Sequence, residues 1–268
     1  MQLSTTTPLD NPAPRTYSIS AVLPAYNEDA VIEQTVRHVA NVLRQLVLNF
    51  EIVVTNDGSR DQTGSILARL RETDPALHLR VVSHPTNLGY GAALASGFDA
   101  ASADLVLMLD ADGQFDVAEL VHLLAALDDE TDLVIGYRVH RADPPMRLLN
   151  AWGWKQLVNG LFGYTARDVD CAFKLFRREV WQSMRVQSRG ATFSAEFLIK
   201  ARRLGFRIRE VPVSHFPRKA GSPTGAHPRV ILRAFVELFQ LRMRLSTDLA
   251  ANNATTASDH SISPRLVA

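Results

Sequence analysis

Short hydrophobic runs alternate along the chain with longer segments in which hydrophobic positions recur at helical spacing. The short runs are rich in Val, Ile and Leu and predict buried strands at 18–23, 51–55, 79–83, 105–109 and 133–136. The longer segments predict helices at 29–46, 61–71, 90–101, 117–127 and 194–204. Alternation of this kind is typical of an α/β fold with a doubly wound, mostly parallel sheet flanked by helices.

Local signals refine the ends of these helices. Ser59 with Gln62, and Asp116 with Glu119, have the spacing of a capping box, in which two side chains bond the first free N–H groups of a helix. Gly205 follows the 194–204 segment and predicts its end.

The length of 268 residues suits one large catalytic domain, which we place at 17–217. Residues 218–246 are expected to form a basic loop followed by an amphipathic helix. The segments 1–16 and 247–268 are rich in small and polar residues, so we expect two disordered tails.

Charge and cysteine content exclude several classes of protein. The formal net charge is +1, and acids and bases are mixed, so we expect no nucleic acid as a partner. Cys171 is the single cysteine, which excludes an intramolecular disulfide and favours the cytoplasm. No apolar run approaches the roughly 20 residues of a spanning helix, and the N-terminus lacks the pattern of a signal peptide.

Polar residues follow the predicted strands directly. In a doubly wound sheet, ligands bind beyond the carboxyl ends of the strands, so these residues form the candidate site. They are Pro24-Ala25-Tyr26-Asn27-Glu28, Asn56-Asp57-Gly58-Ser59, Asn87-Leu88-Gly89-Tyr90-Gly91 and Asp110-Ala111-Asp112-Gly113-Gln114.

The fourth of these segments carries the sharpest chemistry. Asp110 and Asp112 follow an apolar strand and present hard oxygen ligands at the edge of the sheet. Mg²⁺ or Mn²⁺ suits such ligands, and these ions usually complete their shell with water and substrate phosphate, which implies a diphosphate. An acidic turn that caps a helix is the alternative reading of the same residues.

The other segments have residues suited to a nucleoside. Asp57 and Glu28 could accept hydrogen bonds from a base and a ribose, and Tyr26 could pack on a base. Gly89 and Gly91 allow a close approach of backbone. Each also has a purely structural reading, as a turn, the edge of the core, or helix packing on the sheet.

Taken together, in this order and spacing, the four segments resemble glycosyltransferase family 2, and most closely its polyprenyl-phosphate glycosyltransferases, typified by dolichol-phosphate mannosyltransferase. The resemblance covers residues 19–222. It implies a GT-A fold, a Rossmann-like single catalytic domain, and inverting sugar transfer. By this resemblance Pro24, Ala25, Tyr26, Glu28 and Asp57 hold the nucleoside, Ala111 lies beside the nucleotide, and the metal ligands are Asp110, Asp112 and Gln114.

The second half of the chain is expected to choose the acceptor. Arg138 and Arg147 resemble the positions that hold a lipid phosphate in that subgroup, and guanidinium groups suit phosphate because they stay charged and donate in a fork. Asp168, Asp170 and Lys174 lie in a segment that resembles another motif of the subgroup, although Ala172 replaces the usual glycine. Each of these residues could instead be structural, as a solvated arginine, a turn or a strand-face lysine.

Four further residues have weaker assignments. Arg218 and Ser222 lie in a segment that resembles the flexible basic loop that closes over the phosphates in this subgroup. A plain solvated loop is the alternative. Glu196 in the 194–204 helix reads equally well as a surface or capping carboxylate, and Cys171 is expected to be a packing residue.

The chemistry depends on the acceptor. A polyprenyl phosphate is a monoester with a second pKa of about 6, so it is mostly dianionic at neutral pH and needs little help from a base. A carbohydrate hydroxyl would need a base, for which Asp168 and Asp170 are the candidates. Pro24 to Glu28 lacks the glycine-rich basic loop typical of a nucleotidyltransferase, and an inactive nucleotide-binding protein remains a second alternative.

The segment Pro228 to Leu245 bears on access to a lipid. Its hydrophobic residues recur at helical spacing between arginines, which predicts a basic amphipathic helix that could lie in a membrane interface. Packing on the domain or in a dimer is the alternative. We therefore expect peripheral attachment to the cytoplasmic face of a membrane, with GDP-mannose or UDP-glucose as the leading donors.

Overall fold

The computed structural model describes residues 15–139, 145–217 and 234–245. Its described strands form one seven-stranded sheet in the order β3-β2-β1-β4-β6-β5-β7. Parallel pairing joins β1 (Arg15–Ala25), β2 (Val47–Asn56), β3 (Leu79–Ser83) and β4 (Leu105–Met108). The other half holds β5 (Leu133–Arg138), β6 (Lys174–Arg177) and β7 (Ile208–Val213), with β6 antiparallel to both β4 and β5.

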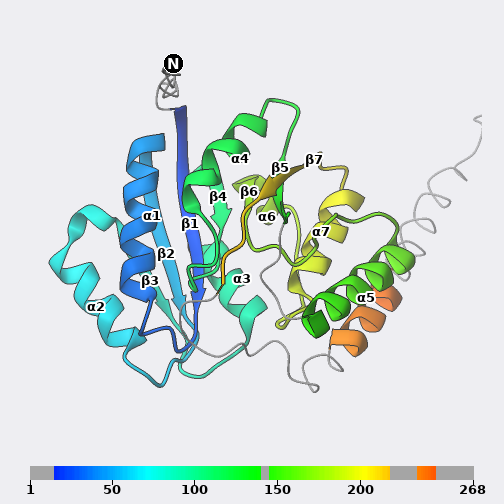
Figure 1. Ribbon diagram of the computed structural model, residues 1–268, viewed down its shortest axis with the longest axis horizontal. Helices are drawn as coiled ribbons and strands as arrows, with labels where there is room; N and C mark the ends of the chain where they lie inside the picture. Colours follow the sequence, from blue (N-terminus) through cyan, green and yellow to red (C-terminus); the bar gives the residue numbers. More distant parts are fainter. Residues whose placement is uncertain (1–14, 140–144, 218–233, 246–268) are drawn as a thin grey trace, which may run out of the picture.

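Helices cover both faces of this sheet (Figure 1). α1 (Ile32–Leu46) and α4 (Leu120–Ala126) lie over one face, while α3 (Tyr90–Ala100), which contacts α7 (Phe193–Arg203), packs on β1 and β2 from the other. A Cβ on Gly97 of α3 would meet the side chain of Val22, so the absence of a side chain there lets the helix lie close to β1. The remaining described helices are α2 (Thr63–Thr73), α5 (Pro145–Phe162), α6 (Arg178–Gln182), the short 3₁₀ turns η1 (Pro75–Leu77) and η2 (Val117–Glu119), and residues 234–245.

An aromatic cluster joins α3, β6, α6 and α7. The Phe98 ring meets those of Phe176 and Trp181 edge-on, at centroid distances of 5.2 and 5.1 Å. Phe193 and Phe197 stack with their rings nearly parallel in α7. Such rings bury large apolar area and have preferred mutual geometry, so the cluster fixes α7 against α3.

The predicted strands and helices are all present, with changes at their ends. α1 begins at Ile32, not at residue 29, because the Glu28 carbonyl accepts the N–H groups of Val31 and Ile32 in a turn before the helix. The predicted 117–127 helix divides into η2 and α4. β1 begins at Arg15, inside the segment predicted to be a tail.

The capping boxes are wrong in detail. Ser59 caps no helix, because its Oγ accepts the N–H of Asn27, and Asp61 accepts the N–H of Thr63 at the start of α2. Asp116 does accept the N–H of Ala118 at the start of η2. Glu119, its expected partner, bonds Ser214 in place of the Asp116 backbone. Long-range contacts therefore outcompete the local pairing that sequence spacing suggests.

No helix in the described part of the chain is long and apolar enough to cross a membrane. Most of both predicted tails, the basic loop with Arg218 and Ser222, and the first part of the 228–245 helix lie outside the described residues. The described end of that last segment, 234–245, is helical as predicted.

Candidate active site

The loops after β1 and β2 interlock at the edge of the sheet. Asn27, which adopts a positive φ of 55°, donates its N–H to Ser59 and accepts the N–H of Arg60 through its side chain. The N–H of Glu28 donates to the Thr63 hydroxyl at 2.9 Å. Asparagine tolerates a left-handed backbone better than most residues, and it also caps the neighbouring loop here. The segment Pro24 to Glu28 is thereby held in place before any ligand arrives.

Asp57 is the central acceptor of the adjoining loop. Its carboxylate accepts the N–H groups of Leu88 and Gly89, both at 2.9 Å, and bonds the His84 ring at 2.7 Å. The residue is 2% exposed. Its predicted role toward a nucleoside base stays a prediction, and its observed role is to fasten the loop after β3 to the end of β2.

The glycines of the third segment serve a contact within the protein. A Cβ on Gly89 would lie 2.6 Å from the Arg189 carbonyl oxygen, and one on Gly91 would strike Ser188 and Phe193. That close approach lets the N–H groups of Gly91 and Ala92 donate to the Arg189 carbonyl at 2.9 and 3.3 Å. The N–H of Gly89 itself donates to Asp57, so the structural reading of this pair accounts for the close backbone approach.

The end of β4 holds the paired carboxylates. Asp112 is 6% exposed and accepts the N–H of Gln114, while Asp110 accepts the Tyr90 hydroxyl at 2.9 Å. Burial, and after it the nearby charge of Asp112, raise the pKa of Asp110 to about 7 against the lowering effect of the hydrogen bond from Tyr90. Ala111, between them, is buried, and its carbonyl accepts the Thr35 hydroxyl.

This arrangement fits a divalent cation. Two carboxylates that disfavour each other's charge in a buried place gain from a cation between them, and hard ions prefer carboxylate oxygens. Among the described residues, no group of three His, Cys, Asp or Glu side chains could hold a metal. Magnesium sites usually take one or two carboxylates with water and phosphate, so a pair is enough when the substrate carries a diphosphate.

Gln114 ties this loop to the segment that follows β7. Its Nε2 donates to the Phe216 carbonyl at 2.9 Å, and the Phe216 N–H donates to the Gln114 carbonyl at 2.8 Å. Only the side-chain Oε1 could therefore serve as the metal ligand that the resemblance implies. These two bonds join the segment after β7 to the loop that carries Asp110 and Asp112.

Arg138 and Asp168 form an almost buried ion pair. The Arg138 Nε and Nη2 atoms donate to the two Asp168 oxygens at 2.6 and 2.8 Å, and the two side chains are 9% and 11% exposed. Burial lowers the pKa of Arg138, but the hydrogen bond and charge of Asp168 outweigh it and raise the pKa overall. Much of the guanidinium fork predicted for a lipid phosphate is thus engaged by Asp168.

Lys174 lies fully buried at the first position of β6. Its Nζ donates to the backbone carbonyls of Val169 and Cys171, which closes the loop that carries Asp168 and Asp170. Burial lowers the pKa of Lys174 against the raising effect of the neighbouring acids. Burial raises the pKa of the Cys171 thiol to about 11, which fits packing and not nucleophilic chemistry.

The acidic residues after β4 and the basic residues of β5 and β6 lie close enough for their charges to interact. The charges of Arg138 and Lys174 lower the pKa of Asp110, and the charge of Asp170, which is solvent-exposed, acts on Tyr90, Arg138 and Lys174. The antiparallel course of β6 explains this proximity, because it brings the start of β6 to the edge where β4 and β5 end.

The side chains of three predicted site residues lie outside the described residues, and Glu196 differs from its predicted structural role. Arg147 belongs to the first turn of α5, but its side chain lies outside the described residues, as do Arg218 and Ser222. Glu196 is neither a surface nor a capping carboxylate. It is fully buried and accepts hydrogen bonds from Gln187, Ser188 and Lys200.

Sequence reasoning also missed three contributors to the site, namely Tyr90, His84 and Arg189. Tyr90 stood inside a recognised motif, and the tyrosine between two glycines was the available signal. His84 and the Arg189 carbonyl carried no signal, because their roles depend on which loops meet in space.

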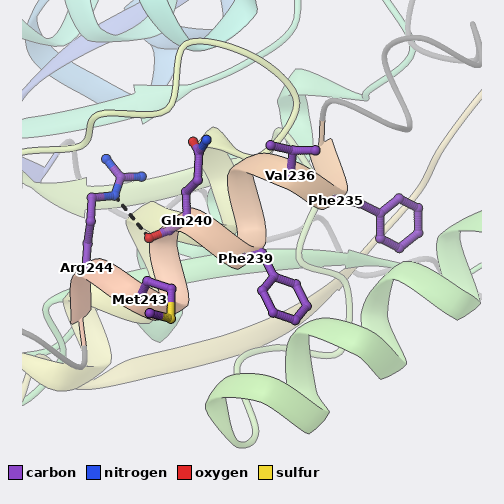
Figure 2. Close-up of a pocket in the computed structure, with 6 residues that line it drawn as sticks. All are labelled: Phe235, Val236, Phe239, Gln240, Met243 and Arg244. Carbon is purple, nitrogen blue, oxygen red and sulfur yellow. Dashed lines mark hydrogen bonds between the residues drawn. The ribbon is translucent and has the colours of Figure 1, made fainter.

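An exposed apolar surface lies on the second half of the molecule. The helix 234–245 buries Ala234, Leu238, Leu241 and Leu245 against the domain. Phe235, Phe239 and Met243 project from one side of it and line a groove with Val236 (Figure 2). Phe235 meets Trp154 of α5 edge-on, and α5 adds Leu148, Leu149 and Trp152 as exposed side chains. The helix thus packs on the domain and still presents a second apolar stripe.

Comparison with known sequences places residues 20–184 in the family described as "Glycosyl transferase family 2". A dolichyl-phosphate beta-glucosyltransferase of Trichomonas vaginalis is 33% identical over 219 residues, covering 75% of this chain and 66% of that protein. Polyprenol monophosphomannose synthase of Mycolicibacterium smegmatis is 30% identical over 215 residues, covering 75% and 78%. A glycosyltransferase of Haloferax volcanii is 34% identical over 209 residues, but the chain spans only 33% of its length.

Among solved structures, glucosyl-3-phosphoglycerate synthase from Mycobacterium tuberculosis superposes with a TM-score of 0.66 at 23% identity, covering 84% of this chain and 80% of that one. Structures of that enzyme contain Mn²⁺ with uridine diphosphate or UDP-glucose. At this identity the likeness shows a shared fold, and it confirms the predicted α/β architecture.

Proposed function

Because the chain belongs to glycosyl transferase family 2, we propose that it transfers a hexose from a nucleoside diphosphate sugar to a polyprenyl phosphate, with inversion at the anomeric carbon. One observation carries the proposal. An acidic pair, the half-buried Asp110 and the buried Asp112, shares a sheet edge and an electrostatic environment with the basic residues Arg138 and Lys174. A donor diphosphate with its cation and an acceptor phosphate would need opposite charges arranged in this way.

The donor would lie over the ends of β1, β2 and β4. The interlocked loop from Pro24 to Glu28 offers a rigid platform for the nucleoside, since its backbone is already fixed by Ser59, Arg60 and Thr63. Asp110, Asp112 and Oε1 of Gln114 would hold Mg²⁺ or Mn²⁺. The cation would supply charge stabilisation for the diphosphate as it leaves.

The acceptor would approach from the side of β5 and β6. Arg138 is proposed to meet the acceptor phosphate with the part of its guanidinium that Asp168 does not engage. Lys174 is proposed to act through its charge, because its buried Nζ donates to the Val169 and Cys171 carbonyls. Arg147, Arg218 and Ser222 are proposed to contribute further contacts to this phosphate. The ion pair with Asp168 fixes the orientation of Arg138 in advance, which lowers the cost of ordering it when phosphate binds.

The reaction needs no proton transfer if the acceptor is a phosphate. An oxygen of the dianionic monoester attacks the anomeric carbon, a new C–O bond forms there, and the bond to the donor diphosphate breaks with the electron pair leaving on the diphosphate. For a hydroxyl acceptor, Asp168 and Asp170 stay the candidate bases, and Asp168 would have to give up a hydrogen bond from Arg138 to act as one.

Contact with a membrane would bring the polyprenyl chain to the site. We propose that the apolar stripe of helix 234–245, with the exposed residues of α5, rests in the lipid interface of the cytoplasmic face. Arg242 and Arg244 lie on the same helix, where they would favour anionic headgroups. The relatives named for dolichyl or polyprenyl substrates support a lipid acceptor.

The decisive test is a transfer assay with purified protein. Radiolabelled GDP-mannose, UDP-glucose and UDP-N-acetylglucosamine are each incubated with Mn²⁺ and a membrane-lipid extract, and label is counted in the organic phase. We expect metal-dependent label in lipid from one donor. Binding of nucleotide without lipid label would contradict the proposal and favour a glycan acceptor or an inactive binding protein.

A further inference from the structure

Tyr90 touches the proposed metal site without being one of its expected ligands. Its hydroxyl donates to Asp110 Oδ1 at 2.9 Å from the first position of α3. A partner on one oxygen restricts the rotation of a carboxylate and leaves the other oxygen oriented for a cation. Such outer partners typically account for 10–100-fold of metal affinity.

The position of Tyr90 depends on how the start of α3 is held. The two N–H groups before it, of Leu88 and Gly89, donate to Asp57. The two after it, of Gly91 and Ala92, donate to the Arg189 carbonyl. Tyr90 is thus fixed between two anchors, of which the second belongs to a segment distant in sequence.

That segment is held in turn by the buried Glu196. The carboxylate accepts the N–H groups of Gln187 and Ser188 at 3.0 and 2.9 Å and the Ser188 hydroxyl at 2.6 Å, and it pairs with Lys200. Burial raises its pKa, but the hydrogen bonds from Lys200, Ser188 and Gln187 outweigh burial and lower the pKa overall. A charged side chain that is fully buried is costly unless its partners are in place.

We propose that Tyr90 is a positioning residue for Asp110, and that Glu196 holds Tyr90 in register through the 187–189 segment. The inference rests on the proposed metal-dependent transfer and adds to it a supporting chain of contacts. In this chain Glu196 fixes Ser188 and Arg189, the Arg189 carbonyl fixes the start of α3, and Tyr90 fixes Asp110.

The first test removes one oxygen atom. Tyr90→Phe is compared with Tyr164→Phe, a matched control whose hydroxyl also donates to a carboxylate, that of Glu210, away from the acidic pair. Binding of Mn²⁺ in the presence of UDP or GDP is followed by the EPR signal of free Mn²⁺. We expect about 10-fold weaker Mn²⁺ binding for Tyr90→Phe, and an unchanged value for the control. If Tyr90→Phe, like the control, bound Mn²⁺ as tightly as the wild type, the inference would be overturned.

The second test asks whether Glu196 acts through Tyr90. Glu196→Gln and the milder Ser188→Ala are each combined with Tyr90→Phe, and Ser188→Ala alone suffices if Glu196→Gln does not fold. If the contacts form one chain, each double variant should bind Mn²⁺ no more weakly than its weaker parent. Additive losses would contradict the role of Glu196.

The same titration separates failure of the inference from failure of the proposed function. Wild-type protein that binds no Mn²⁺ with either nucleotide would contradict the proposed metal site itself. Wild-type binding with an unaffected Tyr90→Phe would leave the proposed function intact and reject only the positioning role.

Discussion

The two halves of the sheet edge are built in different ways. On the side of β1, β2 and β3, side chains such as Asn27 and Asp57 bond backbone N–H groups of neighbouring loops. On the side of β5 and β6, charged side chains bond one another or backbone carbonyls, as in Arg138 with Asp168 and Lys174 with Val169. The first side is a fixed platform, and the second is a set of balanced charges.

Under the proposed function, this difference separates a donor side from an acceptor side. A platform made from backbone contacts suits a nucleoside, which is read by shape and hydrogen bonds and changes little during transfer. A buried charge pair suits an anionic acceptor, because a phosphate can share a cation that is already oriented. Substitutions should therefore act differently on the two sides, and the acidic pair between them should be the most sensitive place.

The largest effect is expected at the acidic pair itself. Asp112→Asn should lower kcat by about 100-fold or more, because it removes charge stabilisation worth several kcal/mol. Asp116→Asn is the matched control in the same loop, since Asp116 only caps η2. Initial rates at saturating Mn²⁺, with circular dichroism to check the fold, measure the effect. Similar rates for both variants would show that the Asp112 carboxylate does not stabilise the departing diphosphate.

Removal of Arg138 tests the balanced charges. Arg138→Ala should raise the KM for acceptor more than the KM for donor, and it should lower the free energy of unfolding by about 3–5 kcal/mol because Asp168 loses its partner in an almost buried place. The double variant Arg138→Ala, Asp168→Asn should recover stability but not acceptor binding. A larger rise in the KM for donor than in the KM for acceptor would contradict the placement of Arg138 on the acceptor side.

The apolar stripe sharpens the contrast on the acceptor side. Phe239→Ser with Met243→Ser should weaken sedimentation with anionic phospholipid vesicles by about 10-fold or more, since burial of each such side chain contributes about 1.5–3 kcal/mol. Leu48→Ser removes a side chain of similar exposure, 65% against 64%, at the start of β2 and should leave binding unchanged. Equal loss from both would indicate nonspecific adsorption.

The smallest expected effect concerns pH and stability. The pKa of Asp110 is raised to about 7 from an ordinary value of 3.8, so the folded state holds a proton that the unfolded state releases between these values. Stability from this group is present at low pH and is lost as pH rises through about 7. Asp110→Asn should therefore melt higher than wild type at pH 8 in EDTA, and the difference should shrink toward pH 5. In thermal melts, added Mn²⁺ should raise the melting temperature of the wild type more than that of Asp110→Asn.

Much of the fold could be predicted because the central strands are continuous apolar runs. β4, for example, is buried at every position. β6 could not be predicted as easily, since it is short, begins with a buried lysine and ends with an arginine. Family membership, predicted from the four strand-end segments, is confirmed by the match over residues 20–184.

The candidate site was predicted as a set of residues but not as a set of contacts. Arg138 lies near enough to Asp110 for its charge to lower the pKa of that carboxyl, but no spacing in the sequence indicated this. The partners of Asp57, the engagement of Arg138 by Asp168 and the burial of Glu196 depend on loops that meet only in the folded chain, so no spacing rule could give them. The roles of these residues toward substrate stay predictions.

The reversed strand β6 has one more consequence, for how such a protein can change in evolution. Ile135 of β5 pairs directly with Lys174 of β6, so the stretch between these strands, including α5, leaves the sheet and returns at neighbouring positions. Lengthening such a segment adds little to the free-energy cost of folding, because the entropic cost of loop closure rises slowly with loop length. The stretch could therefore be exchanged or lengthened while the loops after β1 and β2 stay intact. Under the proposed function, this would offer a route to new acceptors without a change at the proposed nucleotide site.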